Sequence, residues 1–404
     1  MKTVGIVAEY NPFHSGHEYQ ISYAKKTLGA DYCIVVMSGP FTQRGLPAIF
    51  DKYTRAESAI KCGADLVLEL PAVYATASAE IFAEGAVKIL QATGIVDTVL
   101  FGCETPDMSK IEKAADILLA EPVSYVDVLK ESLANGESFP KARALALASQ
   151  GITGIAEDPN NILAIEYVKA IKKYNYTLTP VGMQRLGAGY HDLDLNGVHA
   201  SASGIREHIF SSSNTDFLSQ IPDTLKDNYM KVFQNNCYLS PEDFSLPLLY
   251  ALLTHSSFDE YSDCSKELSN KILRSVDLYE SFDSFCGILK SKDIAHTRIT
   301  RVLNHIMLQI TKEFSEESRT LETAPYLRIL SAKKTSEELF TAIKKGGYAP
   351  MVTSPKVALE QLHGIELEIF KKDLFSADLY RSILSQKTHQ KLPNEFTRKF
   401  SLIS

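Results

Sequence analysis

The sequence predicts an α/β protein in which a parallel sheet, covered by helices on both sides, is followed by a mostly helical C-terminal portion. Two observations lead to this prediction. Through the first 105 residues, short runs that are apolar on both faces alternate with helical patterns, which is typical of a parallel sheet between two helical layers. Beyond residue 215, helical patterns account for most of the chain.

The elements of the sheet region follow from apolar spacing. We predict strands over Thr3–Ala8, Asp31–Ser38, Leu66–Leu70, Thr98–Phe101 and Leu178–Met183, and helices over His17–Leu28, Asp51–Cys62 and Ala75–Gln91. Each strand is a short apolar run bounded by turn residues such as Pro71. The helices instead repeat apolar residues every three to four positions.

The remaining elements are mostly helical. Met108 to Tyr174 is expected to be helical with breaks near Pro122, Pro140 and Pro159, and a loop over Gly187–Gly197 precedes a helix over Ser201–Phe210. The linker-like stretch SSSNTD predicts a division into a catalytic domain (1–215) and a C-terminal portion (216–404). We expect later helices over Leu246–Leu253, Ser265–Leu289, Thr297–Thr311, Ser336–Ile343 and Val357–Phe370, and two short strands, Tyr326–Ser331 and Ala349–Val352, of a small α+β subdomain.

Composition places the chain among ordinary globular proteins. Of its 404 residues, 45% are hydrophobic and 23% are charged. No apolar run approaches the roughly 18 to 20 residues of a membrane span, and the N-terminus lacks a signal peptide, so we expect a cytoplasmic protein with no membrane partner. The six cysteines form no CxxC or Cys/His cluster, which argues against structural zinc and for a reducing compartment.

Charge is distributed unevenly. The net charge of −7 argues against indiscriminate nucleic-acid binding. However, residues 287–404 carry 19 Lys or Arg and 13 Asp or Glu. A polyanionic partner could bind there, although a modest positive balance is also common on a solvated surface.

The strongest motif is Asn11-Pro-Phe-His-Ser-Gly-His17, which follows the first predicted strand and opens the first helix. In a Rossmann-like domain this turn binds the nucleotide. Gly16 lets the backbone approach a ligand, the helix N-terminus favours phosphate, and His14 and His17 can both donate to phosphate oxygens. Neither GxGxxG nor GxxxxGK[ST] is present, which excludes the dinucleotide fingerprint and the P-loop. The alternative is an exposed turn with two histidines.

A second phosphate-binding element is predicted at Ser201–Arg206 (SASGIR). Small hydroxyl residues cap a helix there, and Arg206 can reach the phosphates of a nucleotide. The alternative is an ordinary N-cap followed by a solvent-exposed arginine.

Eight segments follow one another along the chain: GIVAEYNPFHSGHEYQI, MSGPFTQRGLPAIFDKYTRAESAIKCGADLVLELP, LFGCE, PNNILAIEY, MQRLGAGYHD, SASGIR, TRITRVLNHIML and PYLRIL. In these segments the chain resembles the bacterial tRNA(Met) cytidine acetate ligases, which belong to the HxGH nucleotidyltransferases. The resemblance implies an enzyme that activates acetate with ATP to acetyl-adenylate and then acetylates N4 of the wobble cytidine of elongator tRNA(Met). ATP and tRNA are then its partners, with no DNA, and Mg²⁺ is carried by the phosphates.

The resemblance also implies site residues. His14 and His17 are expected to be catalytic. The expected ATP contacts are Val7, Ala8, Glu9, Tyr10, Asn11, Pro12, Phe13, His14, Ser15, Gly16, His17, Glu18, Tyr19, Gln20, Gly102, Asn161, Arg185, Ser203 and Arg206. From the residues alone, Gly102 also suits a plain turn and Asn161 a helix N-cap. Pro40, Thr42 and Leu46 depart from the family pattern in the loop after the second strand.

Further candidates have open alternatives. Gln43 and Arg44 are expected to contact the acyl group or tRNA, or to lie in a surface loop. Arg298 and Arg301 share a helix face with His305, which suits either tRNA contact or a solvated face. Glu69 is a candidate cleft residue, because an unpaired carboxylate inside an apolar strand is costly.

Two other functions fit parts of the pattern. A small-molecule nucleotidyltransferase that makes a cofactor would use the same histidine turn, but it leaves the long C-terminal portion without a task. A catalytically silent, nucleotide-dependent RNA-binding protein would not need His14, Gly16 and His17, all of which are present.

Overall fold

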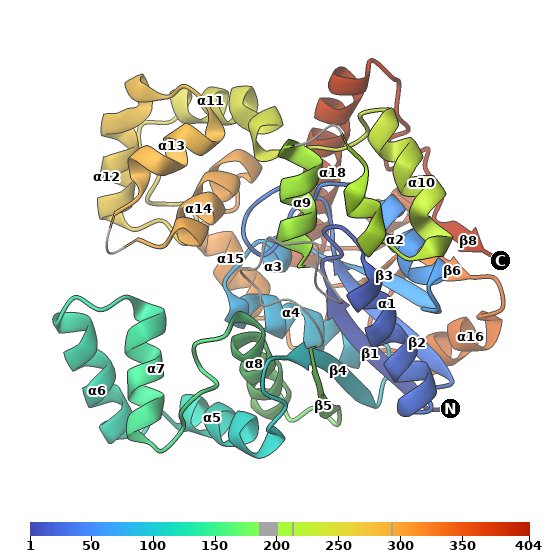
Figure 1. Ribbon diagram of the computed structural model, residues 1–404, viewed down its shortest axis with the longest axis horizontal. Helices are drawn as coiled ribbons and strands as arrows, with labels where there is room; N and C mark the ends of the chain where they lie inside the picture. The colour runs from blue at the N-terminus through green and yellow to red at the C-terminus, as the bar shows by residue number, and fades with distance from the viewer. Residues whose placement is uncertain (186–200, 212–213, 292–293) are drawn as a thin grey trace.

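The computed structural model describes residues 1–185, 201–211, 214–291 and 294–404. The residues in these ranges form an eight-stranded sheet through the centre, and helices cover both of its faces (Figure 1). The strand order is β5-β4-β1-β2-β3-β6-β7, and β8 pairs with β6. The strands are β1 (Thr3–Ala8), β2 (Tyr32–Ser38), β3 (Leu66–Leu70), β4 (Thr98–Cys103), β5 (Thr179–Gln184), β6 (Leu327–Lys333), β7 (Met351–Val352) and β8 (Ser401–Ile403).

The first five strands confirm the predicted parallel sheet. Val4 on β1 lies opposite Cys33 on β2 and opposite Thr98 on β4, and both pairings are parallel. The residues of β3 are buried on both faces, as expected from its continuous apolar run. All five carboxyl ends therefore meet at one edge of the sheet, where α/β proteins bind ligands.

The predicted α+β subdomain is wrong. Strand β6 pairs antiparallel with β3, with Leu66 opposite Ala332, and β8 pairs parallel with β6. The exposed edge of β3 would otherwise present unpaired backbone groups, and these distant strands cover it. Residues on both sides of the predicted division at 215 thus build one sheet.

Helices pack on the sheet in two layers, each with its own apolar core. One layer contains α1 (Ser15–Ser22), the π-helical turn η1 (Tyr23–Thr27), α2 (Lys52–Lys61), α9 (Ala202–Ser211), η2 (Asp216–Gln220) and α10 (Asp223–Gln234). The other contains α3 (Ala72–Ala75), α4 (Ala79–Ala92), α5 (Met108–Ala120), α8 (Pro159–Lys173), α15 (Lys312–Arg319), α16 (Glu337–Gly346), α17 (Pro355–Gln361) and α18 (Gly364–Thr388). The sequence missed α10 and α15, and it missed the break at His363 between α17 and α18.

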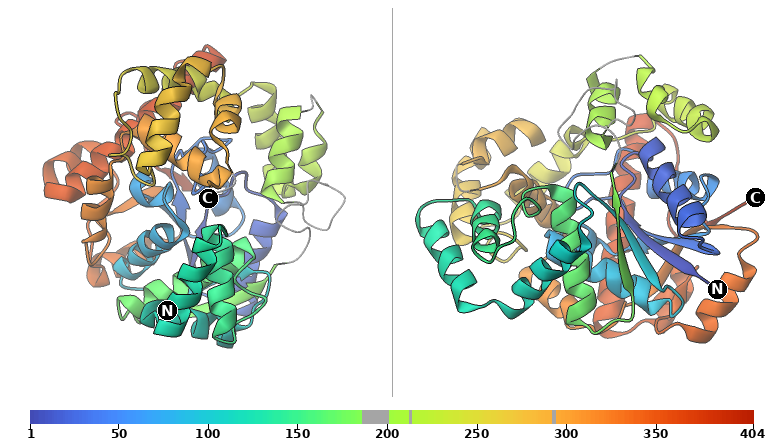
Figure 2. Two further views of the ribbon diagram at one scale, coloured as in Figure 1. Left: turned by 90° about the vertical axis from the view of Figure 1, so that its left-hand side faces the viewer. Right: turned by 60° about the horizontal axis from the view of Figure 1, so that its bottom comes forward.

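Two helical arms project from the same side of this core (Figures 1 and 2). The α6–α7 arm is a hairpin of α6 (Val123–Ala134) and α7 (Phe139–Ser149). The α11–α14 arm contains η3 (Pro241–Phe244), α11 (Ser245–Leu253), α12 (Lys266–Ser275), η4 (Val276–Leu278), α13 (Phe282–Leu289) and α14 (His296–Leu308), and it encloses a third apolar core. The single helix expected over Ser265–Leu289 is interrupted, because Ser281 caps a new helix by accepting from the Ser284 N–H.

The described residues also bear on two predictions, those about membrane spans and about the cysteines. Within the described ranges, no helix has the length and apolar character to cross a membrane. The six cysteines are free thiols. The loop expected over Gly187–Gly197 lies outside the described residues.

Candidate active site

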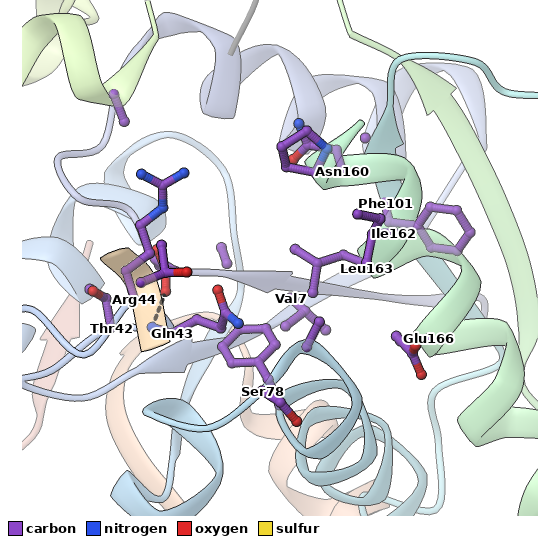
Figure 3. Close-up of a pocket in the computed structure, with 18 of the residues that line it drawn as sticks. Val7, Thr42, Gln43, Arg44, Ser78, Phe101, Asn160, Ile162, Leu163 and Glu166 are labelled. Atoms are coloured by element: carbon purple, nitrogen blue, oxygen red, sulfur yellow. Dashed lines mark hydrogen bonds between the residues drawn. The ribbon is translucent and has the colours of Figure 1, made fainter. Parts of the chain in front are cut away.

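A large cavity lies at the carboxyl ends of β1, β4 and β5 and extends between the two arms. Its volume is about 1010 Å³, at the upper end of the range typical of ligand pockets. Figure 3 shows Gln43 and Arg44, from the loop after β2, on one side of the cavity and Asn160, Leu163 and Glu166, from α8, on the other. The cavity therefore occupies the position that the strand pattern predicts for a nucleotide site.

The histidine turn is held by its own side chains. His14 caps α1, because its Nδ1 accepts from the Gly16 N–H at 3.1 Å. His17 folds back, and its Nδ1 accepts from the His14 N–H at 3.2 Å. The two rings lie 3.8 Å apart between centroids. Since each Nδ1 is an acceptor, a neutral ring must carry its proton on Nε2. Both histidines can thus offer an Nε2–H donor to a ligand.

His17 is kept neutral by its surroundings. Burial lowers its pKa well below the usual value, and the neighbouring His14 and Arg185 lower it further. Gly16, two residues after His14, lines the cavity with both histidines. The turn therefore supplies fixed hydrogen-bond donors, of which His17 is uncharged, beside a backbone that a ligand can approach.

Arg206 connects α9 to this turn. It donates to the Asn11 carbonyl oxygen at 2.5 Å and to Ser203 Oγ at 3.1 Å. The Ser201 Oγ accepts from the Gly204 N–H at 3.0 Å, which is the N-cap predicted from SASGIR. Ser203 and Arg206 line the cavity. The two predicted phosphate-binding elements are thus brought together.

A buried arginine that the sequence analysis did not single out fixes the adjoining loops. Arg55, on α2, has no exposed surface and donates to the carbonyl oxygens of Phe50, Glu9, Ser38 and Gly39. These carbonyls lie at the ends of β1 and β2 and in the loop before α2. The sequence does contain a signal for this role, because Arg55 lies among the apolar residues of a helix that packs on the sheet.

Glu9 adds a second connection between β1 and the loop after β2. Its carboxylate lines the cavity and accepts from the Gln43 N–H at 2.6 Å. Burial raises the pKa of Glu9, and the nearby cations Arg206 and Arg44 counteract this shift. The carboxyl group therefore lies among positive charges at the base of the site.

The loop that carries Gln43 and Arg44 lies between the sheet and the α11–α14 arm. Gln43 Nε2 donates to the Ala77 carbonyl at 3.2 Å, and the Arg44 carbonyl accepts from Thr300 Oγ1 at 2.6 Å. Gly45 has a φ of +72°, and a Cβ there would lie 2.4 Å from the Cα of Arg301. Only glycine fits this contact, so the loop and α14 pack backbone against backbone.

The cavity contains most of the predicted site residues. The following line it: Val7, Ala8, Glu9, Tyr10, Asn11, His14, Gly16, His17, Tyr19, Gln20, Gln43, Arg44, Gly102, Arg185, Ser203, Arg206, Arg298 and Arg301. Thr42 and Leu46, which depart from the family pattern, line it as well. Pro12, Phe13, Ser15, Glu18 and Asn161 are not among its lining residues. Asn161 is fully buried, and its Oδ1 accepts from the Thr105 N–H at 3.1 Å, whereas Asn160 faces the cavity.

The predicted basic stripe on α14 needs correction. His305 is buried, with its two ring nitrogens 3.0 Å from the carbonyl oxygens of Ser262 and Thr76. Arg301 Nε lies 2.6 Å from Asp263 Oδ2, and Arg298 Nε donates to the Asp263 carbonyl at 3.0 Å. The histidine holds the arm to the core, and the two arginines line the cavity instead of forming an outer solvated face with it.

Glu69 is a structural residue and not part of the cleft. Its carboxylate accepts from Lys52 at 2.8 Å and pairs with Arg328 at 3.1 Å, and Glu395 pairs with both cations. All four side chains are buried. A Cβ at Gly39 would lie 2.5 Å from Glu69 Oε1, so this network also limits what can follow β2. The expectation of a cleft residue is therefore wrong.

Comparison with known proteins gives consistent relatives. The profile of the family described as HIGH Nucleotidyl Transferase matches residues 1–395. The chain is 41% identical over 385 residues to the tRNA(Met) cytidine acetate ligase of Thermoanaerobacter sp. (strain X514), covering 94% of this chain and 95% of that protein. It is 34% identical over 416 residues to the tRNA(Met) cytidine acetate ligase of Acetivibrio thermocellus, with 100% of both chains covered.

Solved structures extend the likeness to the whole fold. The apo crystal structure of Thermotoga maritima TmcAL matches with a TM-score of 0.92 at 31% identity, covering 100% of both chains. The crystal structure of the same enzyme bound with alpha-thio ATP matches with a TM-score of 0.90 at 29% identity, covering 100% of this chain and 99% of that one.

Proposed function

We propose that this chain, which belongs to the HIGH Nucleotidyl Transferase family and within it to the tRNA(Met) cytidine acetate ligases, is an ATP-dependent tRNA-modifying ligase. It activates acetate with ATP to acetyl-adenylate. It then acetylates N4 of the wobble cytidine of elongator tRNA(Met) and releases AMP. Its site of action is the cytoplasm, where tRNA and ATP are available, and DNA is not among its partners.

The observation that carries this proposal is the histidine turn at the carboxyl end of β1. In the first step, an acetate oxygen attacks the α-phosphorus of ATP, the bond from that phosphorus to the bridging oxygen breaks, and pyrophosphate leaves. Negative charge passes onto the departing oxygens. The Nε2–H groups of His14 and His17, held in place through their Nδ1 atoms, donate to those oxygens and stabilise the charge.

Arg206 and Arg185 supply the cationic part of the phosphate site. Arg206 is anchored on Asn11 and Ser203, so its guanidinium is already ordered before ATP binds. Because burial keeps His17 uncharged, the site combines a neutral donor with two arginines. This balance suits a product, pyrophosphate, that has to leave.

Mg²⁺ fits this site as an ion carried by the phosphates. Among the described residues, no group of three or more His, Cys, Asp or Glu could hold a metal, so phosphate oxygens and water would supply its ligands. When bound, the ion screens the charge of the triphosphate. The residues of the chain position the nucleotide and the acid.

The second step needs orientation more than a new catalytic group. The N4 amine of cytidine attacks the acetyl carbonyl carbon, the bond to the adenylate oxygen breaks, AMP leaves and N4 loses a proton. An acyl-adenylate is already activated, and holding the two reactants in contact can lower the activation barrier by about 7–11 kcal/mol. The loop with Gln43 and Arg44 lies between the nucleotide turn and the arm, where acetyl group and amine must meet.

One experiment tests the proposal. The purified chain is incubated with ATP, labelled acetate and tRNA, and the tRNA is digested to nucleosides. We expect labelled N4-acetylcytidine from elongator tRNA(Met) and AMP in equal amount. A cofactor nucleotidyltransferase would instead transfer the adenylyl group to a small acceptor, and a silent RNA-binding protein would consume no ATP. Either result contradicts the proposal.

A further inference from the structure

None of the residues assigned above to the adenylation step lies in the part of the cavity between the two arms. It is lined by Tyr125, Leu129, Phe139 and Arg143 from the α6–α7 arm and by Thr297, Arg298 and Arg301 from α14. We call this the outer part of the cavity. Figures 1 and 2 show the two arms as separate bodies on the same side of the sheet. The outer part is therefore bounded by elements other than those that carry the histidine turn and Arg206.

Phe139 is unusual among the residues of the outer part. It is the first residue of α7, it lines the cavity, and its side chain is 57% exposed. Arg143 lies one turn further on the same face and pairs with Glu166 at 2.6 Å. An aromatic ring facing an open cavity beside a guanidinium is the combination on which unstacked nucleobases bind.

The charge of the cavity suits a polyanion. Seven Arg or Lys and five Asp or Glu side chains line it, although the whole chain carries a net charge of −7. On the wall opposite Phe139, Arg298 and Arg301 lie at the first turns of α14. A peptide or protein partner with an apolar face would have to bury these charges, whereas RNA phosphates would pair with them.

We propose that the outer part of the cavity takes the unpaired loop of the RNA substrate, and that Phe139 stacks on one base of that loop. This inference rests on the proposed function and adds to it the path by which the RNA reaches the adenylate. Arg298 and Arg301 bind the loop phosphates from the opposite arm. The target cytidine, unstacked from its neighbours, then extends inward past Arg44 to the acetyl-adenylate.

The two arms are placed to hold such a loop from both sides. Helices α6 and α7 pack mainly on one another, and Arg143 on α7 pairs with Glu166 on α8. The α11–α14 arm is anchored by Thr300 and His305, which contact the loop after β2 and the turn after α3. One wall of the outer part is thus the α6–α7 hairpin. The other wall, formed by the α11–α14 arm, is fixed to the loops beside the nucleotide site.

The first test compares substitutions of Phe139 with a matched control. Phe139→Ala removes the ring, Phe139→Trp keeps an aromatic surface, and Leu145→Ala changes another exposed apolar residue of α7 that does not line the cavity. We expect Phe139→Ala to raise the KM for tRNA about 5- to 150-fold, the loss that one stacked base accounts for. Phe139→Trp should restore a KM near that of the wild type, and Leu145→Ala should keep it.

The readouts separate this inference from the proposed function. Acetate-dependent ATP–pyrophosphate exchange in the wild type reports adenylate formation without RNA, and its absence would contradict the proposed function. If exchange and acetylation occur but Phe139→Ala keeps the wild-type KM for tRNA, the stacking inference is wrong. It is also wrong if Leu145→Ala loses as much as Phe139→Ala, since the effect would then belong to the packing of the hairpin.

A second measurement locates the RNA directly on the full chain. An RNA hairpin with the anticodon stem and loop, carrying 4-thiouridine at one loop position, is irradiated with the wild-type protein. We expect crosslinked peptides from the start of α7 or of α14. Crosslinks confined to α10, α16 or α18, which do not face the cavity, would overturn the inference. A second hairpin, with 2-aminopurine in the loop, should lose fluorescence on binding the wild type and less on binding Phe139→Ala.

Discussion

The two ends of the cavity are built from different interactions. At the inner end, His14, His17, Arg206 and Arg55 are held by hydrogen bonds to backbone groups. At the outer end, the charged side chains pair mainly with one another, as in Arg143 with Glu166, Lys169 with Glu166 and Glu80, and Arg301 with Asp263.

This difference in anchoring corresponds to the different tasks of the two ends. Donors that stabilise a developing charge must be in place before the reaction, because reorganising them would cost free energy at that moment. Backbone groups are suitable anchors, since they move only when the fold moves. Ion pairs between side chains can instead exchange one partner for an RNA phosphate and re-form after release. The inner end is thus fixed, and the outer end can adapt.

The largest effect is expected at the fixed end. His14→Ala and His17→Ala should each lower acetate-dependent ATP–pyrophosphate exchange about 10²–10³-fold, because each removes a pre-positioned donor. His363→Ala, an exposed position before α18 outside the cavity, is the control and should keep the wild-type rate. Thermal melting checks the fold. Exchange at the wild-type rate in either cavity variant would contradict the assignment.

Arg55 tests whether backbone anchoring matters as much as the donors themselves. Arg55→Lys keeps the charge but cannot reach all four carbonyls, so some buried acceptors lose their partner, at about 1–3 kcal/mol each. We expect a lower free energy of unfolding in urea. We also expect exchange about 10²-fold slower in the folded protein, since small misplacements at a reacting site have this effect. A stable variant with normal exchange would show that the loops do not depend on Arg55.

The sequence could predict the histidine turn of the inner end because the pattern of that turn is local. The histidine turn lies within a few residues of β1, and the bounds of β1 and β3 agree with the apolar runs. The antiparallel pairing of β6 with β3 joins residues more than 250 positions apart, and no local spacing encodes it. His305 looked like part of a surface stripe because the carbonyls that enclose it belong to Ser262 and Thr76, far away in the chain.

A smaller effect is expected from the adaptable end. Arg298→Ala should weaken tRNA binding a fewfold and reduce the slope of log affinity against log salt by about 0.7 to 0.9, the value for one phosphate contact. Arg381→Ala, on α18 and outside the cavity, is the matched control. Equal affinity and slope for wild type and Arg298→Ala would leave Arg298 without a role in binding the RNA.

The smallest effect on the reaction is expected behind the inner end of the cavity. Charged side chains are buried there and do not line the cavity. Asp373 on α18 accepts from the Ala72 N–H at 2.7 Å and from the Tyr326 hydroxyl at 2.5 Å. Burial, and next the nearby Glu69, raise its pKa to about 7. Asn can accept from Ala72 and place its amide against the Tyr326 oxygen, so Asp373→Asn should fold and keep the wild-type exchange rate.

The effect of Asp373→Asn should appear in stability as a function of pH. Because the folded pKa of Asp373 is above its unfolded value, the folded state binds more protons between about pH 4 and pH 7, and this residue's contribution to stability falls as pH rises through that window. Lowered pKa values of the buried His17 and His305 give the opposite slope in both proteins, so the difference between wild type and variant isolates Asp373.

In urea unfolding from pH 5 to pH 8, the stability of the wild type relative to Asp373→Asn should fall by up to about 1.4 kcal/mol per pH unit and level off above pH 7. A difference that stays constant with pH would mean that Asp373 remains ionised throughout, and that the buried charges behind the site are fully compensated by Arg328 and Lys52.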